Sequence, residues 1–274
     1  MLVTLIGNNK MHKLTLPDTP IGNYWVTDKS GEREKKLVNI EGRENSWQVV
    51  GNNYAEVIDI DAIEIKESKI RINKANKIIN NRIVLKNYSM CGIILKEINE
   101  LFILYCSPTY EKNFIHFNIK KATEFFIGNG FHNHISYNNK LVANIHARIY
   151  SYDGRWRIEN FDPNFGTFVN NKPVGNGGKI LSNGDIIYIM GLKIIIMGRS
   201  IFINNPQNTV KCNNDIFIFN KSKLEIPVFK KEEDQNVEIY SEDDYFFRVP
   251  RITNIIEKET VKIESPPQIQ DKEE

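Results

Sequence analysis

Short β-rich runs alternate with turn residues along much of the chain. In the second half, turn residues cluster at 162–164, 175–178 and 182–185, and β-rich runs such as 156–158, 167–169 and 185–189 flank these clusters. Runs of this length, with a turn signal every ~8–12 residues, are typical of a β-sandwich or barrel. The pattern therefore predicts an all-β fold.

The first half follows the same pattern. Residues 2–6 and 12–16 are β-rich and flank Gly7-Asn8-Asn9, which predicts a hairpin. Pro17 and Pro20 then end the pairing. Further strands are expected at residues 46–50, 54–65, 69–72 and 101–106, with turns at 51–53 and 80–81.

The expected strands of the second half lie between residues 114 and 203. They are residues 114–117, 123–127, 134–137, 146–150, 155–159, 167–169, 186–190, 193–197 and 201–203. From Asn204 onward the chain is richer in charge, although residues 217–219 could form one more strand. The segment 265–268, Ser-Pro-Pro-Gln, is typical of a linker.

A weak internal repeat suggests how the chain is divided. Ile21-Gly22-Asn23 followed by Trp47 parallels Ile127-Gly128-Asn129 followed by Trp156. We interpret this as two copies of one sandwich with a boundary near Pro108. The expected domains are a highly divergent first copy (1–108), a second copy (109–205) and an extended tail (206–274).

Charge and composition narrow the function classes. The 36 basic and 34 acidic residues leave a formal net charge of +2, so bulk charge gives no case for nucleic-acid binding. Cys91, Cys106 and Cys212 are interpreted as buried thiols in a reducing compartment. The start lacks the basic segment of a signal peptide, and no apolar run is long enough to span a bilayer. These features favour a cytosolic, soluble chain.

Gly166 to Asn170 read Gly-Thr-Phe-Val-Asn, and residues 181–187 read Leu-Ser-Asn-Gly-Asp-Ile-Ile. These are two of four blocks that resemble the forkhead-associated (FHA) domain. Upstream, residues 126–129 stand where that family has Gly-Arg, and residues 144–149 stand where it has a Ser-Arg-x-His-Ala segment. The order and spacing of all four blocks agree with the family, so the resemblance implies a β-sandwich.

The tail is similar to a more specific family. Residues 247–252 and 261–267 resemble the segment between the tandem FHA domains and the first membrane helix of EssC proteins, the membrane-bound FtsK/SpoIIIE-type ATPases of Firmicutes type VII secretion systems. The resemblance implies the cytoplasmic side of the cell membrane, as part of a longer membrane protein. It also implies other secretion components as partners, including a pseudokinase-like membrane subunit. The ATPase modules of that family are absent from this sequence.

An FHA domain reads phosphothreonine through loops at one end of its sandwich, and a phosphate calls for a bidentate cation and short donors. The family resemblance places the Arg position at Asn129, the Ser position at Ala143 and a peptide-fixing Asn position at Phe165. We therefore expect the phosphothreonine site to be degenerate. The matching positions are Gly128, Asn129, Ala143, Asn144, His146, Asn164, Phe165, Gly166, Thr167 and Asn170.

The resemblance also gives the retained positions architectural roles. Gly128 and Gly166 would permit tight turns, His146 would hold the loops together from the interior, and Thr167 would cap a turn. Asn170 would tie neighbouring loops.

No other motif predicts a catalytic, metal or cofactor site. His132 and His134 resemble a metal-ligand pair, but no acidic or Cys partner is near in sequence. The run 175–180 resembles part of a phosphate-binding loop. The position of the first Gly of that loop is occupied by Pro173, and Ile180 stands where the loop needs Ser or Thr. We therefore expect no enzyme activity, cofactor or metal.

Two functions remain open. The first is a non-catalytic interaction module that docks secretion components without needing a phosphate, with no nucleic acid bound and membrane contact only through the parent chain. The alternative is a phosphothreonine-dependent signalling adaptor. It would require Asn144 and Asn164, with Lys172 or Arg148 nearby, to rebuild an anion site.

Overall fold

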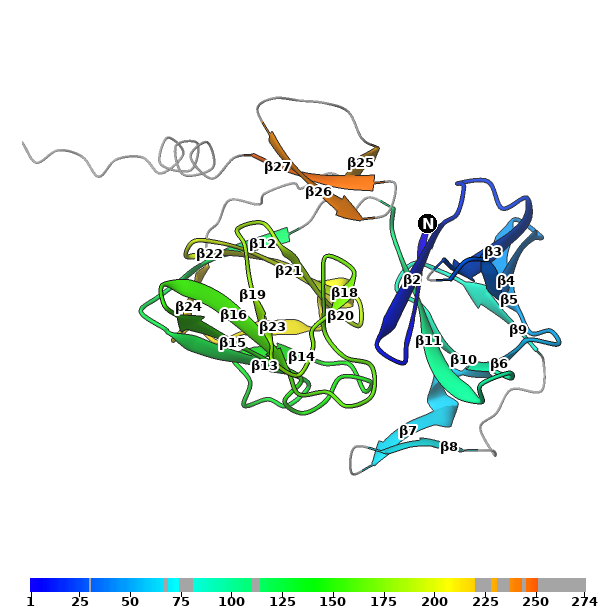
Figure 1. The fold of residues 1–274 in the computed structure, drawn as a ribbon, viewed down its shortest axis with the longest axis horizontal. Helices are drawn as coiled ribbons and strands as arrows, with labels where there is room; N and C mark the ends of the chain where they lie inside the picture. The colour runs from blue at the N-terminus through cyan, green and yellow to red at the C-terminus, as the bar shows by residue number, and fades with distance from the viewer. Residues whose placement is uncertain are drawn as a thin grey trace, which may run out of the picture.

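The computed structural model describes residues 1–29, 31–66, 69–73, 81–109, 114–219, 228–230, 237–242 and 245–250. The fold in these segments is all-β, as predicted, and helical structure is limited to the 3₁₀ turns η1 (Ile60–Ala62) and η3 (Pro206–Asn208). Figure 1 shows two sandwiches side by side, with the strands of the C-terminal segment above them.

The first sandwich contains eleven strands. They are β1 (Leu2–Gly7), β2 (Lys10–Thr15), β3 (Gly22–Asp28), β4 (Lys35–Arg43), β5 (Ser46–Val50), β6 (Ala55–Asp59), β7 (Ile63–Lys66), β8 (Lys69–Ile72), β9 (Arg82–Leu85), β10 (Met90–Leu95) and β11 (Glu100–Ser107). The sheets β2-β1-β11-β10-β6 and β3-β4-β5-β9 enclose an apolar core, and β7 and β8 form a separate pair. The hairpin expected at Gly7-Asn8-Asn9 is confirmed, with Asn8 and Asn9 at φ of 49° and 54°.

The second sandwich has a seven-stranded and a six-stranded sheet, ordered β18-β17-β20-β21-β22-β12-β24 and β19-β16-β15-β13-β14-β23. Their bounds are β12 (Phe114–Ile119), β13 (Glu124–Gly128), β14 (Ile135–Tyr137), β15 (Ala147–Tyr152), β16 (Arg155–Asn160), β17 (Phe168–Val169), β18 (Lys172–Pro173), β19 (Lys179–Ile180), β20 (Ile186–Ile189), β21 (Leu192–Met197), β22 (Ser200–Asn204), β23 (Val210–Cys212) and β24 (Phe217–Phe219). β20 and β21 are buried along their whole length.

Strands continue past residue 205, where the sequence analysis placed the end of this sandwich. β23 pairs with β14, and β24 pairs with β12, so both sheets gain an edge strand from the segment expected to be tail. Phe217 reaches the core and is 1% exposed. Farther on, β25 (Val228–Lys230), β26 (Val237–Glu242) and β27 (Tyr245–Pro250) form a three-stranded antiparallel sheet. Residues 251–274, which include the linker-like segment 265–268, lie outside the described residues.

The two sandwiches share part of their topology. The neighbours β1-β11-β10-β6 in the first correspond in order to β12-β22-β21-β20 in the second. The Ile-Gly-Asn repeat, however, does not fall at equivalent places, because Gly22 begins β3 whereas Gly128 ends β13. The physical reason is β2, which follows β1 as a hairpin partner and returns the chain to the opposite end before β3 begins.

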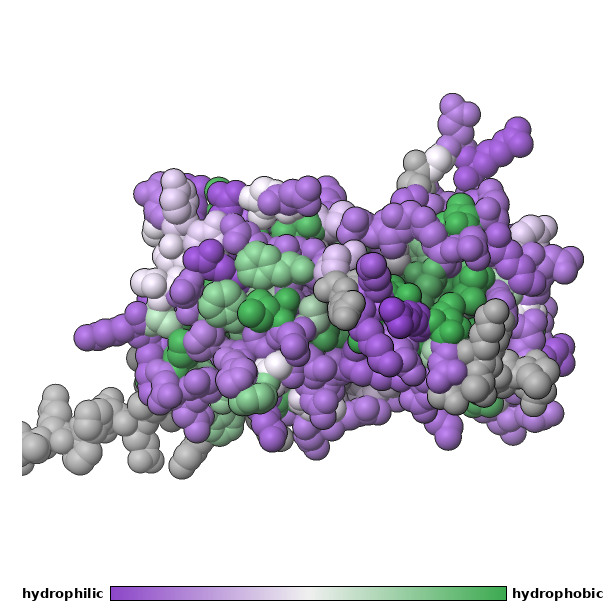
Figure 2. Space-filling view, turned by 90° about the horizontal axis from the view of Figure 1, so that it is seen from below, coloured by the Kyte–Doolittle hydropathy of each residue, from purple (hydrophilic) through white to green (hydrophobic). Residues whose placement is uncertain are grey.

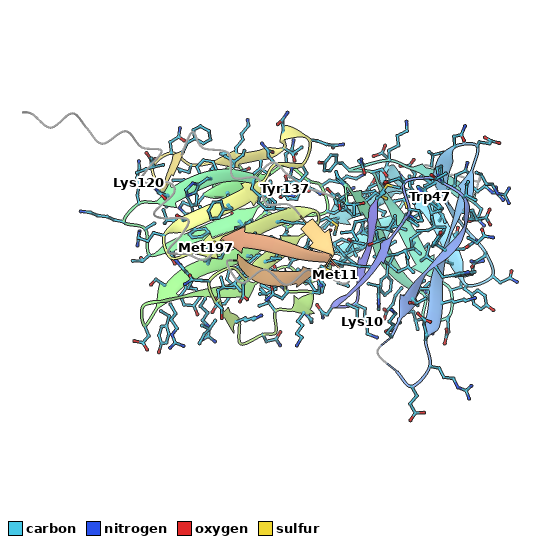
Figure 3. The ribbon with its side chains drawn as sticks, turned by 90° about the horizontal axis from the view of Figure 1, so that it is seen from above. Lys10, Met11, Trp47, Lys120, Tyr137 and Met197 are labelled. Atoms are coloured by element: carbon cyan, nitrogen blue, oxygen red, sulfur yellow. The ribbon has the colours of Figure 1, made fainter. Side chains whose placement is uncertain are left out.

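The sandwiches pack directly on each other. Ile6, Ile58 and Ile103 of the first belong to the same buried cluster as the core of the second. Met11 of β2 packs against that cluster and lies where the sandwiches meet (Figure 3). Lys140 Nζ also reaches Asp61 Oδ1 at 3.0 Å across the boundary.

Candidate functional site

The residues singled out from the sequence gather at one end of the second sandwich. We call this end the apex and define it by three segments: 128–134 after β13, 143–146 before β15, and 160–167 between β16 and β17. Backbone hydrogen bonds join the segments, since Phe161 N donates to His146 O at 2.8 Å and Gly130 N donates to Asn144 O at 3.2 Å.

Gly128 allows the first two segments to touch. A Cβ atom at this position would lie 2.2 Å from the carbonyl oxygen of Asn144, so no side chain fits. Next to it, Asn129 N donates to Ala143 O at 2.9 Å. Asn133 is buried and donates through Nδ2 to the carbonyl oxygens of Gly130 and Asn144, at 2.7 and 2.5 Å. The sequence analysis missed Asn133, whose only signal was its place among turn residues.

His146 holds the apex from inside. Its side chain is fully buried, its Nδ1 accepts a hydrogen bond from Ala143 N at 3.3 Å, and its Nε2 lies 3.0 Å from Gly166 O. An accepting Nδ1 and a donating Nε2 describe the neutral imidazole. Burial lowers the pKa of His146, and the nearby Asp162 only partly opposes this effect. His146 is therefore a neutral tie between two loops.

Asp162 organises the third segment and was not among the predicted site residues. Its buried carboxylate accepts hydrogen bonds from the backbone N–H groups of Asn164, Phe165 and Gly166, at 3.2, 2.7 and 2.8 Å. Residues 162–164 were predicted to form a turn, and within this turn the Asp162 side chain is buried. Since three backbone N–H groups of the loop donate to the Asp162 carboxylate, the loop needs no ligand to fix its shape.

Two further polar side chains fix the ends of the loop. Thr167 is 1% exposed, and its hydroxyl donates to Asn160 Oδ1 at 2.9 Å. Asn170 follows β17 and bridges to the start of β20, because its Nδ2 donates to Asp185 Oδ1 at 2.8 Å and its Oδ1 accepts from Ile186 N at 2.9 Å.

The three positions that would contact a phosphopeptide carry no charged donor. Asn129 has an amide, Ala143 has only a methyl group, and the ring of Phe165 is 1% exposed and belongs to the core. A phenyl ring that faces inward cannot hold a peptide backbone outside.

Arg148, which could have supplied a replacement cation, is engaged by carboxylates. Its Nε and Nη2 donate to Glu124 Oε2 at 3.0 and 2.7 Å, and its Nη1 lies 3.7 Å from Glu159 Oε2. Lys172 is exposed on β18, and its backbone pairs with Val169.

Part of the apex faces the first sandwich. Gly166 has a φ of +75°, and a Cβ atom there would lie 3.3 Å from Oδ1 of Asn9, at the tip of the β1–β2 hairpin. On the same side, Gly191 after β20 sits against the ring of Tyr105, where a Cβ would be only 2.3 Å from the ring. The hairpin tip therefore restricts access to the Gly166 side of the apex.

The rest of the apex exposes three large apolar side chains. Phe131, Ile145 and Phe161 are 83%, 52% and 47% exposed, and each belongs to one of the three linked segments. Figure 2 shows a mostly hydrophilic surface interrupted by apolar residues on both sandwiches. Exposed phenyl rings on a loop scaffold held by internal hydrogen bonds are a common feature of binding surfaces.

Other candidate chemistry is not assembled in the described residues. They contain no group of three or more His, Cys, Asp or Glu side chains able to hold a metal. His134 Nδ1 accepts from Phe126 N at 3.0 Å, and His132 packs on Phe131. Within the described segments no helix is long and apolar enough to cross a membrane.

The comparison with protein families finds one match here, to the FHA domain over residues 125–190. This segment is an FHA domain. It contains all three apex segments and the strands that carry them. The FHA resemblance inferred from the sequence is therefore confirmed for the second sandwich.

Among solved structures, the chain is similar to one described as the "N-terminal FHA domain from EssC a component of the bacterial Type VII secretion apparatus". The two are 12% identical, with a TM-score of 0.45, and the alignment covers 82% of this chain and 97% of the other. No curated protein matches the chain.

Proposed function

We propose that the chain is a non-catalytic protein-interaction module whose FHA apex docks a partner without reading a phosphate. FHA domains act as interaction modules rather than catalysts. The observation that carries the proposal is the contrast within the apex. Its internal frame of His146, Asp162 and Thr167 is complete, whereas the phosphate-contact positions 129, 143 and 165 hold an amide, a methyl group and a buried ring.

The electrostatics of phosphate binding support phosphate independence. Hydrogen bonds to a charged partner are about twice as strong as neutral ones, and a bidentate arginine adds geometric specificity. Asn129 offers only a neutral amide, and the guanidinium of Arg148 is already bound by Glu124. The apex instead offers Phe131, Ile145 and Phe161, so its natural ligand is a partner with apolar side chains.

The setting we propose is type VII secretion, on the cytoplasmic side of the membrane, with other secretion components as partners. This part rests on the resemblance of residues 247–252 and 261–267 to the EssC family. We further propose that the first sandwich is a divergent second copy of the fold, supported by the shared order β1-β11-β10-β6 and β12-β22-β21-β20.

Titration of the chain with the cytosolic domains of a type VII secretion complex tests the proposal. The double variant Phe131→Ser/Phe161→Ser should weaken binding by roughly tenfold or more, because buried aromatic anchors dominate interface energies. The matched control is Ile21→Ser/Val84→Ser, which removes two exposed apolar side chains from the first sandwich. Absence of binding to every component, or equal loss in both double variants, would contradict an apex docking site.

A further inference from the structure

A pocket of about 470 Å³ lies at the end of the second sandwich opposite the apex. We call this end the far end and define it by the turns at 119–123, 151–155, 181–184 and 197–200. Lys120 and Met197 lie in these turns, and Figure 3 shows Lys120 on the side away from the first sandwich. The residues that line the pocket include Ser151, Arg155, Trp156, Ile180, Ser182 and Arg199.

The floor of the pocket is rigid. Trp156 packs edge-on against Phe125 of the core, and its Nε1 donates to Gly198 O at 2.7 Å. Gly198 N donates in turn to Asn183 Oδ1 at 2.8 Å, and Leu181 N donates to Trp156 O at 2.8 Å. Three turns distant in sequence are thus tied together around one indole ring.

Two arginines provide the charge of the pocket. Arg199 is held in place, because its Nε donates to Ile119 O at 3.0 Å and its Nη2 reaches Ala122 O at 3.4 Å. Its Nη1 makes no hydrogen bond among the described residues. Arg155 is exposed and makes no ion pair or side-chain hydrogen bond within the described part of the chain. The far end therefore presents guanidinium groups without a bound carboxylate.

The acidic groups nearby do not neutralise these arginines. The carboxylate of Asp185 already accepts from Asn170 Nδ2 and Ser182 N, and lies 4.0 Å from Lys179 Nζ. Asp153 is exposed in the β15–β16 turn, and no ion pair joins it to Arg155 or Arg199 among the described residues. Arg148 in β15 differs from these two arginines, because its guanidinium forms ion pairs with Glu124 and Glu159.

We infer that the far-end pocket binds an oxyanion-bearing peptide segment, whose carboxylate or phosphate groups would lie between Arg155 and Arg199. Arginine is the side chain suited to bidentate recognition of both oxyanions. The volume is too large for one phosphate ion and falls in the range of peptide or ligand sites. The Ser151 and Ser182 hydroxyls offer further donors, and Ile180, 48% exposed, offers an apolar contact beside the charge.

Fluorescence anisotropy with three labelled peptides tests this site. The first peptide alternates Ala and Glu, the second replaces each Glu with Gln, and the third replaces each Glu with phosphoserine. We expect the Glu peptide or the phosphoserine peptide to bind in a salt-sensitive manner and the Gln peptide not to bind. Tighter binding of the phosphoserine peptide assigns a phosphate ligand, and equal or tighter binding of the Glu peptide assigns a carboxylate ligand.

Variants locate the binding. Arg155→Gln changes an exposed side chain that makes no ion pair or side-chain hydrogen bond among the described residues, so the fold should be kept. The variant should weaken binding on the order of tenfold, as loss of a charge-assisted contact would. Arg155→Gln/Arg199→Gln should abolish it. The control Arg71→Gln/Arg82→Gln removes the same charge from exposed strands of the first sandwich and should change affinity by less than about twofold.

Three results would overturn the inference: no binding of either anionic peptide, equal binding of the Gln peptide, or equal loss in the control. The far-end pocket does not rest on the proposed function of the apex, because it uses different loops. A negative result here leaves the apex titration unaffected.

Discussion

Replacement of Asp162 by Asn should destabilise the FHA domain strongly. Asp162 is 3% exposed, and its carboxylate accepts hydrogen bonds from three backbone N–H groups, those of Asn164, Phe165 and Gly166. The amide that replaces it keeps one acceptor oxygen and turns an N–H₂ group toward donors. Each buried donor left unsatisfied costs about 1–3 kcal/mol, and the losses are not fully additive. We expect a decrease of about 2–4 kcal/mol in the free energy of unfolding.

Urea unfolding followed by tryptophan fluorescence measures this decrease. The matched control is Asp153→Asn, the same chemical change at an exposed turn residue with φ of 50°, a conformation that Asn tolerates well. The control should change stability by less than about 0.5 kcal/mol. Similar small effects for Asp162→Asn and Asp153→Asn would refute the reasoning that this carboxylate builds the loop.

Three further predictions follow from buried groups. Gly128→Ala should lower the free energy of unfolding by about 3 kcal/mol, because its Cβ would meet Asn144 O, whereas Gly175→Ala, in open space, should be neutral in the same urea assay. Burial lowers the pKa of His146, and lowers that of His116 to about 4, below the unfolded value near 6.5. The unfolded chain then binds more protons than the folded chain, so the urea midpoint should fall as pH drops from about 6.5 toward 4. A midpoint that rises would contradict a neutral, buried His146. Burial also raises the pKa of the Cys91 thiol, and raises those of Cys106 and Cys212 to about 12, so a thiol reagent should modify the folded chain slowly and the urea-unfolded chain fast; rapid labelling of the folded chain would count against this.

The elements with strong local signals could be predicted from the sequence. The β1–β2 hairpin was accessible because Asn8 and Asn9 tolerate positive φ, and β20 and β21 were accessible as apolar runs beside Gly turns. The apex residues were found through the order of the FHA blocks.

Other features depend on tertiary contacts that leave little trace in sequence. β23 has three residues and lies in a polar segment, so only its pairing with β14 identifies it. The possible strand at residues 217–219 is present as β24, but only its pairing with β12 places it in a sheet. The opposed placement of Gly22 and Gly128 arises from one extra strand, β2. Asp162 belongs to a turn motif, and no local pattern says that its carboxylate faces inward.

The most direct test of the central claim is binding to a degenerate phosphothreonine peptide library, with the unphosphorylated library as control. It should use the Arg155→Gln/Arg199→Gln variant, so that the far-end pocket adds no signal. Absence of phosphate-dependent binding is the result we predict, given Asn129, Ala143 and Phe165 at the contact positions. Phosphate-dependent binding in this variant that is lost on Asn129→Ala or Asn144→Ala would mean that the apex still reads a phosphate, and the account would be wrong.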